Sequence, residues 1–474
     1  MGNGECRVGR NREILRLAVP AIFNNITVPL LGLCDTAIAG HLGAASYLAA
    51  MAVGTMMLNV IFWLSGFLRM GTTGLISQSF GAGNMEAIRE TLRKAFIIAA
   101  AISVLVLALQ RPLELLLFRI IAPDNGVADL ASLYFRIVIW GAPAQLVIMV
   151  VSGWFIGMQN TFIPMVIAVG VNIVNILLSV LLVFVFDCGF AGIAFGTLAA
   201  NWAGCAGALT LMARYSRHTR TRADAWKELH LGTQADAGKG ESESSLNNQN
   251  SSLQNQGLTL NINQWRRFFS VNTDLFFRSA CIMIVTLAMV SFGSRLGETI
   301  LAANTVMMQF FMFFSYFMDG FAFAGEALTG KAQGAGDRPL LRSTVKALLL
   351  WGAGMAAAFF VIYAAGMTPI AGLLTDNQSV RDIVGSMYWL VVVLPPVTVA
   401  AFIFDGVFIG LTRTRILFFT TLFAALVYFG IVALTGGFAP DGGFDNTWLW
   451  VAFETYLLMR GGLLGVAYFR KSRS

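Results

Sequence analysis

The chain carries the signature Gly-x-Phe-Ile-Gly-x-x-x-Thr twice, at Gly153–Thr161 and at Gly406–Thr414, an offset of 253 positions. The same offset relates three further landmarks: Leu48-Ala49-Ala50 to Leu301-Ala302-Ala303, Pro143 to Pro396, and Gly81-Ala82-Gly83 to Gly334-Ala335-Gly336. Four landmarks in one register indicate an internal duplication, so each half must fold into a version of the same bundle. Duplicated membrane chains are typical of secondary transporters, whose substrate and ion sites lie in or between the repeats.

Composition places both halves in a lipid bilayer. Apolar residues make up 57% of the chain and charged residues 12%, against about 25% charged residues in ordinary soluble domains. Such a chain cannot cover a water-exposed surface. Apolar stretches that can cross a hydrocarbon core of about 30 Å lie near residues 15–39, 47–78, 95–110, 131–157, 162–186, 190–213, 267–293, 299–330, 344–366, 384–410, 414–436 and 446–468. The pattern predicts an all-α integral membrane protein with twelve transmembrane helices in two six-helix bundles.

The distribution of Lys and Arg predicts the orientation, because cytoplasmic loops carry the excess of positive charge. With both termini in the cytoplasm, the outer loops hold few of the 32 Lys and Arg residues, namely Arg111, Arg119, Arg295 and Arg381. An even number of spans in each half gives the halves the same orientation, related by a pseudo-two-fold axis along the membrane normal. The net charge of +7 then reflects this bias, and we expect no nucleic acid partner.

The chain divides into three predicted segments. Residues 1–214 form an N-terminal six-helix lobe, residues 215–264 a cytoplasmic linker, and residues 265–474 a C-terminal six-helix lobe. The linker is rich in Ser, Asn, Gln and Gly, and such a segment buries too little apolar surface to offset its ordering entropy. We therefore expect the linker to be partly disordered, which would let the lobes rock independently.

Polar residues in the first half define a candidate ion site. Charged side chains in a membrane span are costly and are candidates for function by default; Asp35, near the outer end of the first span, is such a residue. Asn172, Asn175 and Ser179 share one face of the fifth span, and Thr197 has a similar depth in the sixth. Desolvation disfavours the charged form of a carboxylate, and oxygen ligands suit hard cations. Asp35 is thus expected to bind a proton or a sodium ion; the alternative is a structural hydrogen bond between helices.

The second half has its own polar set, placed toward the inner side: Asp274, Arg278, Asp319, Glu326 and Asp405. Asp274 and Arg278 are four positions apart, so an intrahelical ion pair is the plain alternative to a functional role. Asp319 and Glu326 share a face of the eighth span, where we expect them to look into the second bundle. Glu454 and Arg460 in the last span are expected to form a structural pair.

Pro20 lies inside the first span, fifteen positions before Asp35. Proline removes a backbone donor and clashes with the preceding turn, so we predict a bend there that is linked to the state of Asp35. A static kink is the alternative. The three histidines form no cluster, and apart from sodium at Asp35 we predict no metal site or cofactor.

These residues resemble the multidrug and toxic compound extrusion (MATE) transporters, in the branch typified by the DNA-damage-inducible protein F (DinF). The resemblance covers nearly the whole chain outside residues 215–264. It rests on Cys34-Asp35-Thr36-Ala37-Ile38-Ala39-Gly40-His41-Leu42-Gly43, Asn272-x-Asp274 with Arg278-Ser279, Met318-Asp319-Gly320-Phe321-Ala322 with Glu326-Ala327, and Asp405-Gly406-x-Phe408-Ile409-Gly410.

The resemblance implies a V-shaped central cavity between the lobes and cation-driven export by alternating access. It also implies a coupling site formed by an Asp on helix 1, an Asn and an Asp on helix 5 and a Thr on helix 6, which by position are Asp35, Asn175, Ser179 and Thr197. Ser179 departs from the pattern, because the family has a carboxylate there. Asp35 is then the only titratable group of the set, which favours proton coupling over sodium.

The sequence thus predicts a secondary antiporter, not an enzyme, that exports amphipathic or cationic organic compounds against inward proton or sodium flow. The expected partners are these small molecules and the lipid bilayer. We expect a monomer in the inner membrane of a prokaryote. Two alternatives stay open: a flippase for lipid-linked precursors from the same superfamily, and a non-transporting receptor or scaffold that uses the linker to bind a partner.

Overall fold

The computed structural model describes residues 2–42, 45–121, 125–235, 262–438 and 444–473, and this part of the chain is almost entirely helical, without strands. The first half contains α1 (Gly2–Gly40), α2 (Ala45–Ser65), α3 (Phe67–Gly81), α4 (Met85–Ala108), α5 (Gln110–Ile121), α6 (Asn125–Val138), α7 (Ala142–Gly157), α8 (Phe162–Val180) and α9 (Gly189–Ala235). A 3-10 turn, Ile139–Gly141, precedes α7, and a π-helical turn, Leu181–Val185, follows α8. The second half contains α11 (Ile262–Arg295), α12 (Glu298–Gly334), α13 (Arg338–Leu374), α14 (Gln378–Ser386), α15 (Tyr388–Gly410), α16 (Thr414–Leu434) and α17 (Asn446–Arg473).

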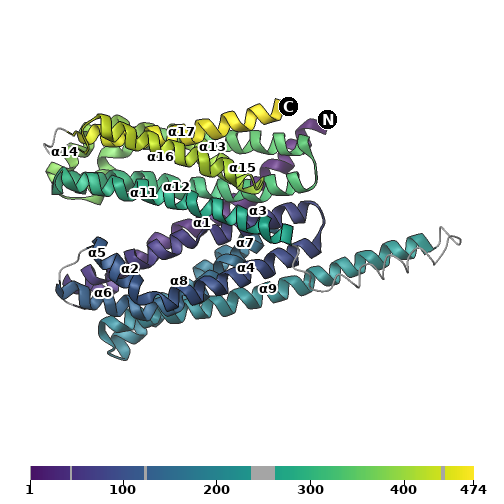
Figure 1. Ribbon diagram of the computed structural model, residues 1–474, viewed down its shortest axis with the longest axis horizontal. Coiled ribbons are helices and arrows are strands. Elements are labelled where there is room, and N and C mark those ends of the chain that lie inside the picture. The colour runs from purple at the N-terminus through teal and green to yellow at the C-terminus, as the bar shows by residue number, and fades with distance from the viewer. Residues whose placement is uncertain (1, 43–44, 122–124, 236–261, 439–443, 474) are drawn as a thin grey trace.

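The helices form two lobes, seen as a lower and an upper layer in Figure 1. In the first lobe α8 packs on α9, and α7 packs on α3 and α4. In the second lobe α15 packs on α12, α13 and α17, and α16 packs on α17 and α11. The predicted all-α architecture of two bundles is confirmed.

Eleven segments of the described chain are long and apolar enough to cross a membrane, and each coincides with a predicted span. The remaining predicted span, 190–213, forms the first part of α9, which packs on α8 and α7. This stretch is rich in Gly and Ala and contains Asn201 and Trp202, so it is less apolar than the others. Its position is nevertheless that of the sixth helix of the first lobe.

Several helices extend beyond the apolar stretch that predicted them. α4 begins at Met85, not near residue 95, because the Asn84 side chain accepts a hydrogen bond from the Ala87 backbone N–H at 2.9 Å. Asp337 caps α13 in the same way, at 2.8 Å from the Leu340 N–H. Asparagine and aspartate are preferred caps, and positions 84 and 337 are related by the repeat. α9 continues through Ala235, into the predicted linker, whose middle lies outside the described residues.

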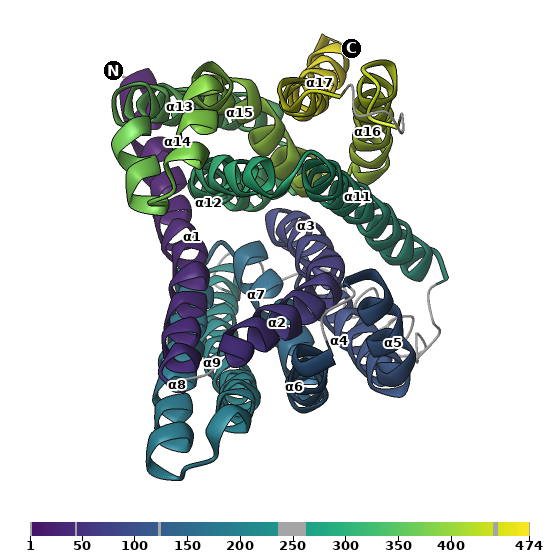
Figure 2. The same ribbon diagram turned by 90° about the vertical axis from the view of Figure 1, so that its left-hand side faces the viewer.

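Helix α1 contacts both lobes, as Figure 2 shows. Its first part packs on α12 and α13 of the second lobe: Glu13 pairs with Lys331 at 2.9 Å, and Asn11 accepts a hydrogen bond from the Trp351 indole at 3.3 Å. Its last part packs on α8 of the first lobe. Although α1 lies within the predicted N-terminal domain, 1–214, it connects the lobes.

The glycines of the duplicated signature explain the packing inside each lobe. A Cβ on Gly153 of α7 would lie 2.6 Å from the Arg69 carbonyl oxygen of α3, and a Cβ on Gly406 of α15 would lie 2.3 Å from the Ala322 carbonyl oxygen of α12. Ala322 is the repeat equivalent of Arg69. Small residues allow helix backbones in membranes to approach this closely. The signature therefore records one helix contact that is made twice.

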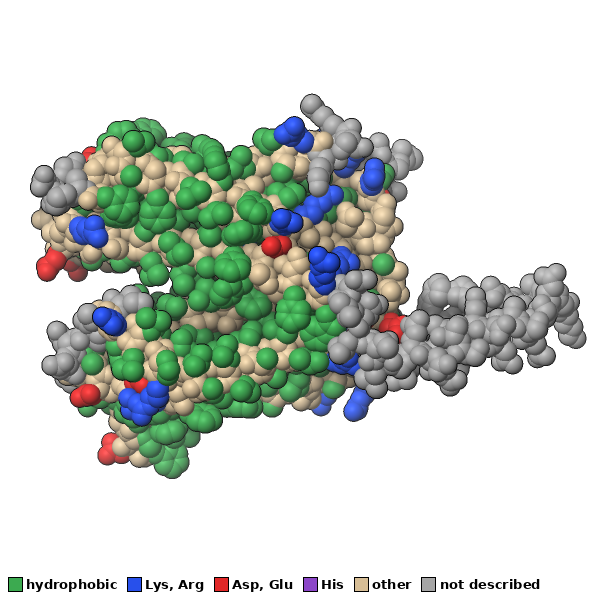
Figure 3. All heavy atoms as spheres, in the orientation of Figure 1, with side chains coloured by type: hydrophobic (Ala, Val, Ile, Leu, Met, Phe, Trp, Pro, Cys, Tyr) green, Lys and Arg blue, Asp and Glu red, His purple; other side chains and the backbone are tan. Residues whose placement is uncertain are grey.

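A further pair of glycines joins the lobes. A Cβ on Gly81 of α3 would lie 2.0 Å from the Lys331 carbonyl oxygen of α12, and a Cβ on Gly334 of α12 would lie 1.9 Å from the Gln78 carbonyl oxygen of α3. At the repeat offset Gly81 corresponds to Gly334 and Gln78 to Lys331, so the contact is symmetric, as at a two-fold interface. It lies toward the end that carries both termini (Figure 1). At the opposite end, Figure 3 shows a notch between the lobes.

We predict that Gly334→Ala lowers the stability of the folded protein by about 1–3 kcal/mol, the usual cost of overpacking a tight contact. The measurement is the midpoint of thermal unfolding of the purified protein. Gly354→Ala is the control, because a Cβ there would meet nothing within 4 Å and alanine favours helix over glycine. Equal midpoints for the two variants would contradict the close contact.

Candidate functional site

Asp35 has the environment expected of an ion acceptor. Its side chain is 8% exposed, and its Oδ1 atom is buried without a hydrogen-bond partner. Among the described residues, no Lys, Arg or His forms an ion pair with it. A buried carboxylate without a partner is costly, so this oxygen favours the binding of a proton or cation.

Three of the other predicted residues form a chain of hydrogen bonds between α8 and α9. The Ser179 hydroxyl donates to Asn175 Oδ1 at 3.2 Å, and Asn175 Nδ2 donates to Thr197 Oγ1 at 3.1 Å. The Thr197 hydroxyl in turn donates to the Ile193 carbonyl oxygen at 3.0 Å. Gly196 makes room for this contact, because a Cβ there would lie 2.4 Å from Ser179 Oγ. The structure thus brings Asn175, Ser179 and Thr197 together.

Tyr134 of α6 lies near both this chain and Asp35, and the sequence did not single it out. Its side chain is buried, and its hydroxyl interacts with Thr197 and Thr55 and lies within electrostatic range of Asp35. Gly54 of α2 packs against its ring, since a Cβ there would lie 2.6 Å from a ring carbon. In the sequence, Tyr134 stands among apolar residues. Nothing in its neighbourhood along the chain distinguishes it from an aromatic residue that only packs in the core.

Asn172 has a different role from its neighbours on α8. Its Nδ2 donates to the Thr27 carbonyl oxygen of α1 at 3.1 Å, so it joins two helices, which was the structural alternative. α1 is helical throughout and contains Pro29 as well as Pro20. Pro29 lies nearer to Asp35 and was not predicted, while a bend at Pro20 stays a prediction.

In the second lobe, Asp405 of α15 lies between two arginines. It forms ion pairs with Arg278 of α11 and Arg460 of α17, and all three side chains are buried. The intrahelical pair of Asp274 with Arg278, which was the alternative to a functional role, is therefore not formed: Asp274 instead accepts a hydrogen bond from the Thr414 hydroxyl at 2.8 Å. The expected pair of Glu454 with Arg460 is wrong, because Arg460 turns to Asp405 and Glu454 Oε1 is buried without a hydrogen-bond partner.

Glu326 of α12 faces the first lobe, and not the second bundle as its helix face suggested. It accepts hydrogen bonds from both terminal nitrogens of Arg69, at 3.0 and 3.4 Å, and is 2% exposed. The Arg69 guanidinium also lies 4.0 Å from the centre of the Phe323 ring. Asp319, half-buried on the same helix, lies within electrostatic range of Arg69 and of Asp405. The polar set of α12 thus lies at the boundary between the lobes.

Asp35 can bind a proton. The amide oxygen of Asn175 and the hydroxyls of Ser179 and Thr197 are, like its carboxylate, oxygens of the kind that hard cations such as sodium prefer, and no described contact joins them to Asp35. Ser179 lies where a second carboxylate would add negative charge. The second-lobe carboxylates Asp405 and Glu326, by contrast, already have arginine partners.

Comparison with known proteins identifies the family. The MatE family model matches residues 20–181 and again residues 275–433. The chain belongs to the MatE family. The two matched segments are related by nearly the same offset as the signature, so each half of the chain matches separately.

Other MatE proteins resemble the chain along most of its length. DNA damage-inducible protein F of Escherichia coli is 32% identical over 98% of the chain and 93% of that protein. Multidrug resistance protein MdtK of Edwardsiella ictaluri is 25% identical over 92% of the chain and 91% of that protein. The crystal structure of the Vibrio cholerae MATE transporter VcmN in the bent form has a TM-score of 0.78 at 17% identity, over 98% of both chains. The resemblance to the DinF branch and the twelve-helix fold are confirmed.

Since MatE proteins are transporters, this chain is a multi-pass membrane transporter and not an enzyme. The family match covers both lobes, including Asp35, Asn175 and Asp405, but stops before residues 190–213 and the last helix. The roles of individual residues follow from their environments and are taken up below.

We predict that Asp405→Asn lowers the stability of the protein by about 3–5 kcal/mol, because it leaves two buried arginines without their carboxylate. Asp376→Asn is the matched control: its partner Arg381 is 3.6 Å away, and Asp376 is fully exposed, so the loss should stay below about 1 kcal/mol. Thermal unfolding of both purified variants measures the difference. A stable Asp405→Asn protein would contradict the buried ion pairs.

Proposed function

We propose that this MatE transporter is a secondary antiporter that exports amphipathic or cationic organic compounds and is driven by inward ion flow. The buried, unpartnered Oδ1 of Asp35 carries the proposal. This atom needs a proton or cation for stability, so binding and release of that ion can be linked to the conformation of α1. MdtK, a relative of the chain, has multidrug resistance in its name, which supports the substrate class.

The arrangement of the lobes supports alternating access. Most of the described hydrogen bonds and ion pairs between the lobes gather toward the end that carries the termini: they include Arg69 with Glu326, Gln78 with Gly410, Gln159 with Ala327, and Glu13 with Lys331. The bond from Asn25 of α1 to the Tyr316 carbonyl oxygen of α12 lies near the middle of both helices. The notch in Figure 3 lies at the opposite end. This is the arrangement expected of a transporter that is closed on one side and open on the other.

We infer that the closed end is cytoplasmic. Lys and Arg side chains gather at this end in Figure 3, and positive residues are enriched on the cytoplasmic side. Both termini then lie in the cytoplasm, the structure corresponds to an outward-open state, and Asp35 lies in the outer half of the membrane. In a prokaryote the protein would reside in the inner membrane.

Proton coupling is favoured over sodium coupling. Asp35 is the only carboxylate among the predicted coupling residues, and Ser179 adds no negative charge. A proton needs one acceptor, whereas a sodium ion requires several oxygens around it. Two of the available oxygens, those of Asn175 and Thr197, already accept hydrogen bonds.

We predict that Asp35→Asn reduces gradient-driven dye efflux from proteoliposomes at least tenfold, because the amide cannot exchange a proton. Asp129→Asn is the control, since Asp129 is an exposed residue of α6 in the same lobe, and it should transport like the wild type. Proton and sodium gradients are imposed in separate experiments. If the Asp35→Asn variant exported dye as fast as the wild type, the mechanism would be refuted. If the wild type exported dye under a sodium gradient but not under a proton gradient, proton coupling would be refuted.

We also predict that Ser179→Ala keeps proton-driven efflux within about threefold of the wild type. The Ser179 hydroxyl bonds to Asn175 and, among the described contacts, not to Asp35, so its loss leaves the proton acceptor intact. If the cluster held sodium, removal of this oxygen would weaken ion binding. A loss of efflux as large as that of Asp35→Asn, measured in the same assay, would contradict the prediction.

A further inference from the structure

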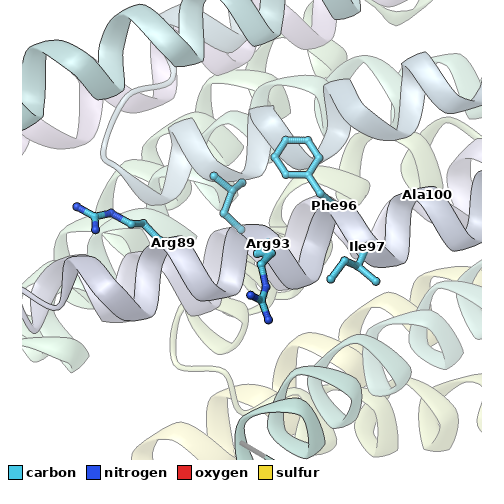
Figure 4. Close-up of a pocket in the computed structure, with 6 residues that line it drawn as sticks. Arg89, Arg93, Phe96, Ile97 and Ala100 are labelled. Carbon is cyan, nitrogen blue, oxygen red and sulfur yellow. The ribbon is translucent and has the colours of Figure 1, made fainter. Parts of the chain in front are cut away.

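A groove runs along the surface of α4 within its membrane-spanning segment, Met85–Ala108. It has a volume of about 480 Å³ and is lined by α4 alone: Arg89, Leu92, Arg93, Phe96, Ile97 and Ala100. Figure 4 shows Phe96 and Ile97 pointing to opposite sides of the helix. Ala100 lies between these walls because of the helical spacing, and its small side chain leaves the floor of the groove open.

The groove has a cationic end and an apolar end. Arg89 and Arg93 are exposed, and neither forms a hydrogen bond or ion pair with the described chain. The neighbouring carboxylate of Glu90 is occupied by Lys94 at 2.6 Å. Ile97 lies about 6 Å further along the helix than Arg93, at about 1.5 Å per residue. Two guanidinium groups therefore precede an apolar slot that leads toward the middle of the membrane.

The duplication repeats this pattern in the second lobe. At the offset of 253, Arg89 and Arg93 correspond to Arg342 and Lys346 of α13, and both of these cations are exposed. The apolar positions are kept as well: Phe96, Ile97 and Ala100 correspond to Leu349, Leu350 and Ala353. The buried charges are not kept in this way, since Asp35 corresponds to Ala288 and Asp405 to Ser152. The sequence pattern of two cations followed by apolar positions is thus shared by the two lobes.

We propose that the α4 groove binds an anionic phospholipid of the cytoplasmic leaflet. Guanidinium groups bind phosphate through paired, charge-assisted hydrogen bonds, and basic residues at the cytoplasmic side attract anionic head groups. The phosphate contacts Arg89 and Arg93, and one acyl chain lies over Ala100 between Phe96 and Ile97. A soluble anion would leave the apolar slot unused, and a soluble protein could not enter the span. The assignment to the cytoplasmic leaflet rests on the proposed function, which places the end with both termini in the cytoplasm.

The test is native mass spectrometry of the purified full-length protein after reconstitution with phosphatidylethanolamine and phosphatidylglycerol. We expect the wild type to retain phosphatidylglycerol in preference to phosphatidylethanolamine. Arg89→Gln/Arg93→Gln should weaken phosphatidylglycerol binding about tenfold or more, since each basic residue at the surface contributes about 1 kcal/mol. The control Arg12→Gln/Arg16→Gln removes the same charge from two exposed residues that lie four positions apart on α1 and should bind like the wild type.

A second pair of variants tests the apolar slot with all charges in place. Ala100→Trp fills the floor and should reduce the retained phosphatidylglycerol, whereas Ala101→Trp, exposed on the next position of the helix, should not. Binding that is unchanged in Arg89→Gln/Arg93→Gln, or equally reduced in its control, would overturn the proposal. The assay measures bound lipid and not transport. Its result would therefore stand even if transport experiments showed that the protein is not an antiporter. An external N-terminus, found by labelling, would overturn the assigned leaflet.

Discussion

Backbone contact at glycine positions determines how this molecule is assembled. Within each lobe, Gly153 and Gly406 let a helix lie against the carbonyl oxygens of α3 or α12, and between the lobes Gly81 and Gly334 do the same across a pseudo-two-fold axis. Any larger side chain would force these backbones apart. Since the inter-lobe contacts gather toward the end that carries the termini, the lobes can separate at the other end while they stay joined. To open at the end that carries the termini, the protein would have to separate the α3 and α12 backbones. The Arg69–Glu326 ion pair would have to break as well.

The buried charged residues do not follow the internal duplication, although the helix contacts of the two lobes do. The contact glycines and the caps at Asn84 and Asp337 follow the duplication, but the buried carboxylates do not. Asp35 has no carboxylate counterpart at the repeat offset, and Glu326 corresponds to Thr73. Asp35 in the first lobe has no arginine partner, whereas Asp405 and Glu326 in the second are neutralised by arginine and Glu454 keeps one buried oxygen without a hydrogen-bond partner. An unpartnered oxygen can exchange an ion at low cost, whereas a paired carboxylate must first lose its arginine. This difference separates Asp35 from Asp405 and Glu326, whose ion pairs stabilise the fold.

Much of the fold could be read from the sequence, because apolar length and composition act locally. The predicted spans correspond to the observed helices, with boundaries shifted where caps such as Asn84 extend a helix into charged sequence. The cluster of Asn175, Ser179 and Thr197 was also predictable, since helical spacing and depth bring these residues together. The same local reasoning misplaced Arg278, Glu326 and Arg460, because their partners lie on helices far along the chain. Tyr134 was missed because its polar neighbours come from α1, α2 and α9.

The sequence by itself determined that this protein is a duplicated, all-helical membrane protein, and its motifs placed it in a transporter family. Those properties depend on hydrophobic length, charge asymmetry and repeat register, which are present in the unfolded chain. The tertiary structure decided which carboxylates are paired, that α1 contacts both lobes, and which end of the molecule is closed. These features depend on contacts between helices distant in sequence, where an ångström of backbone separation decides whether a glycine contact or an ion pair forms.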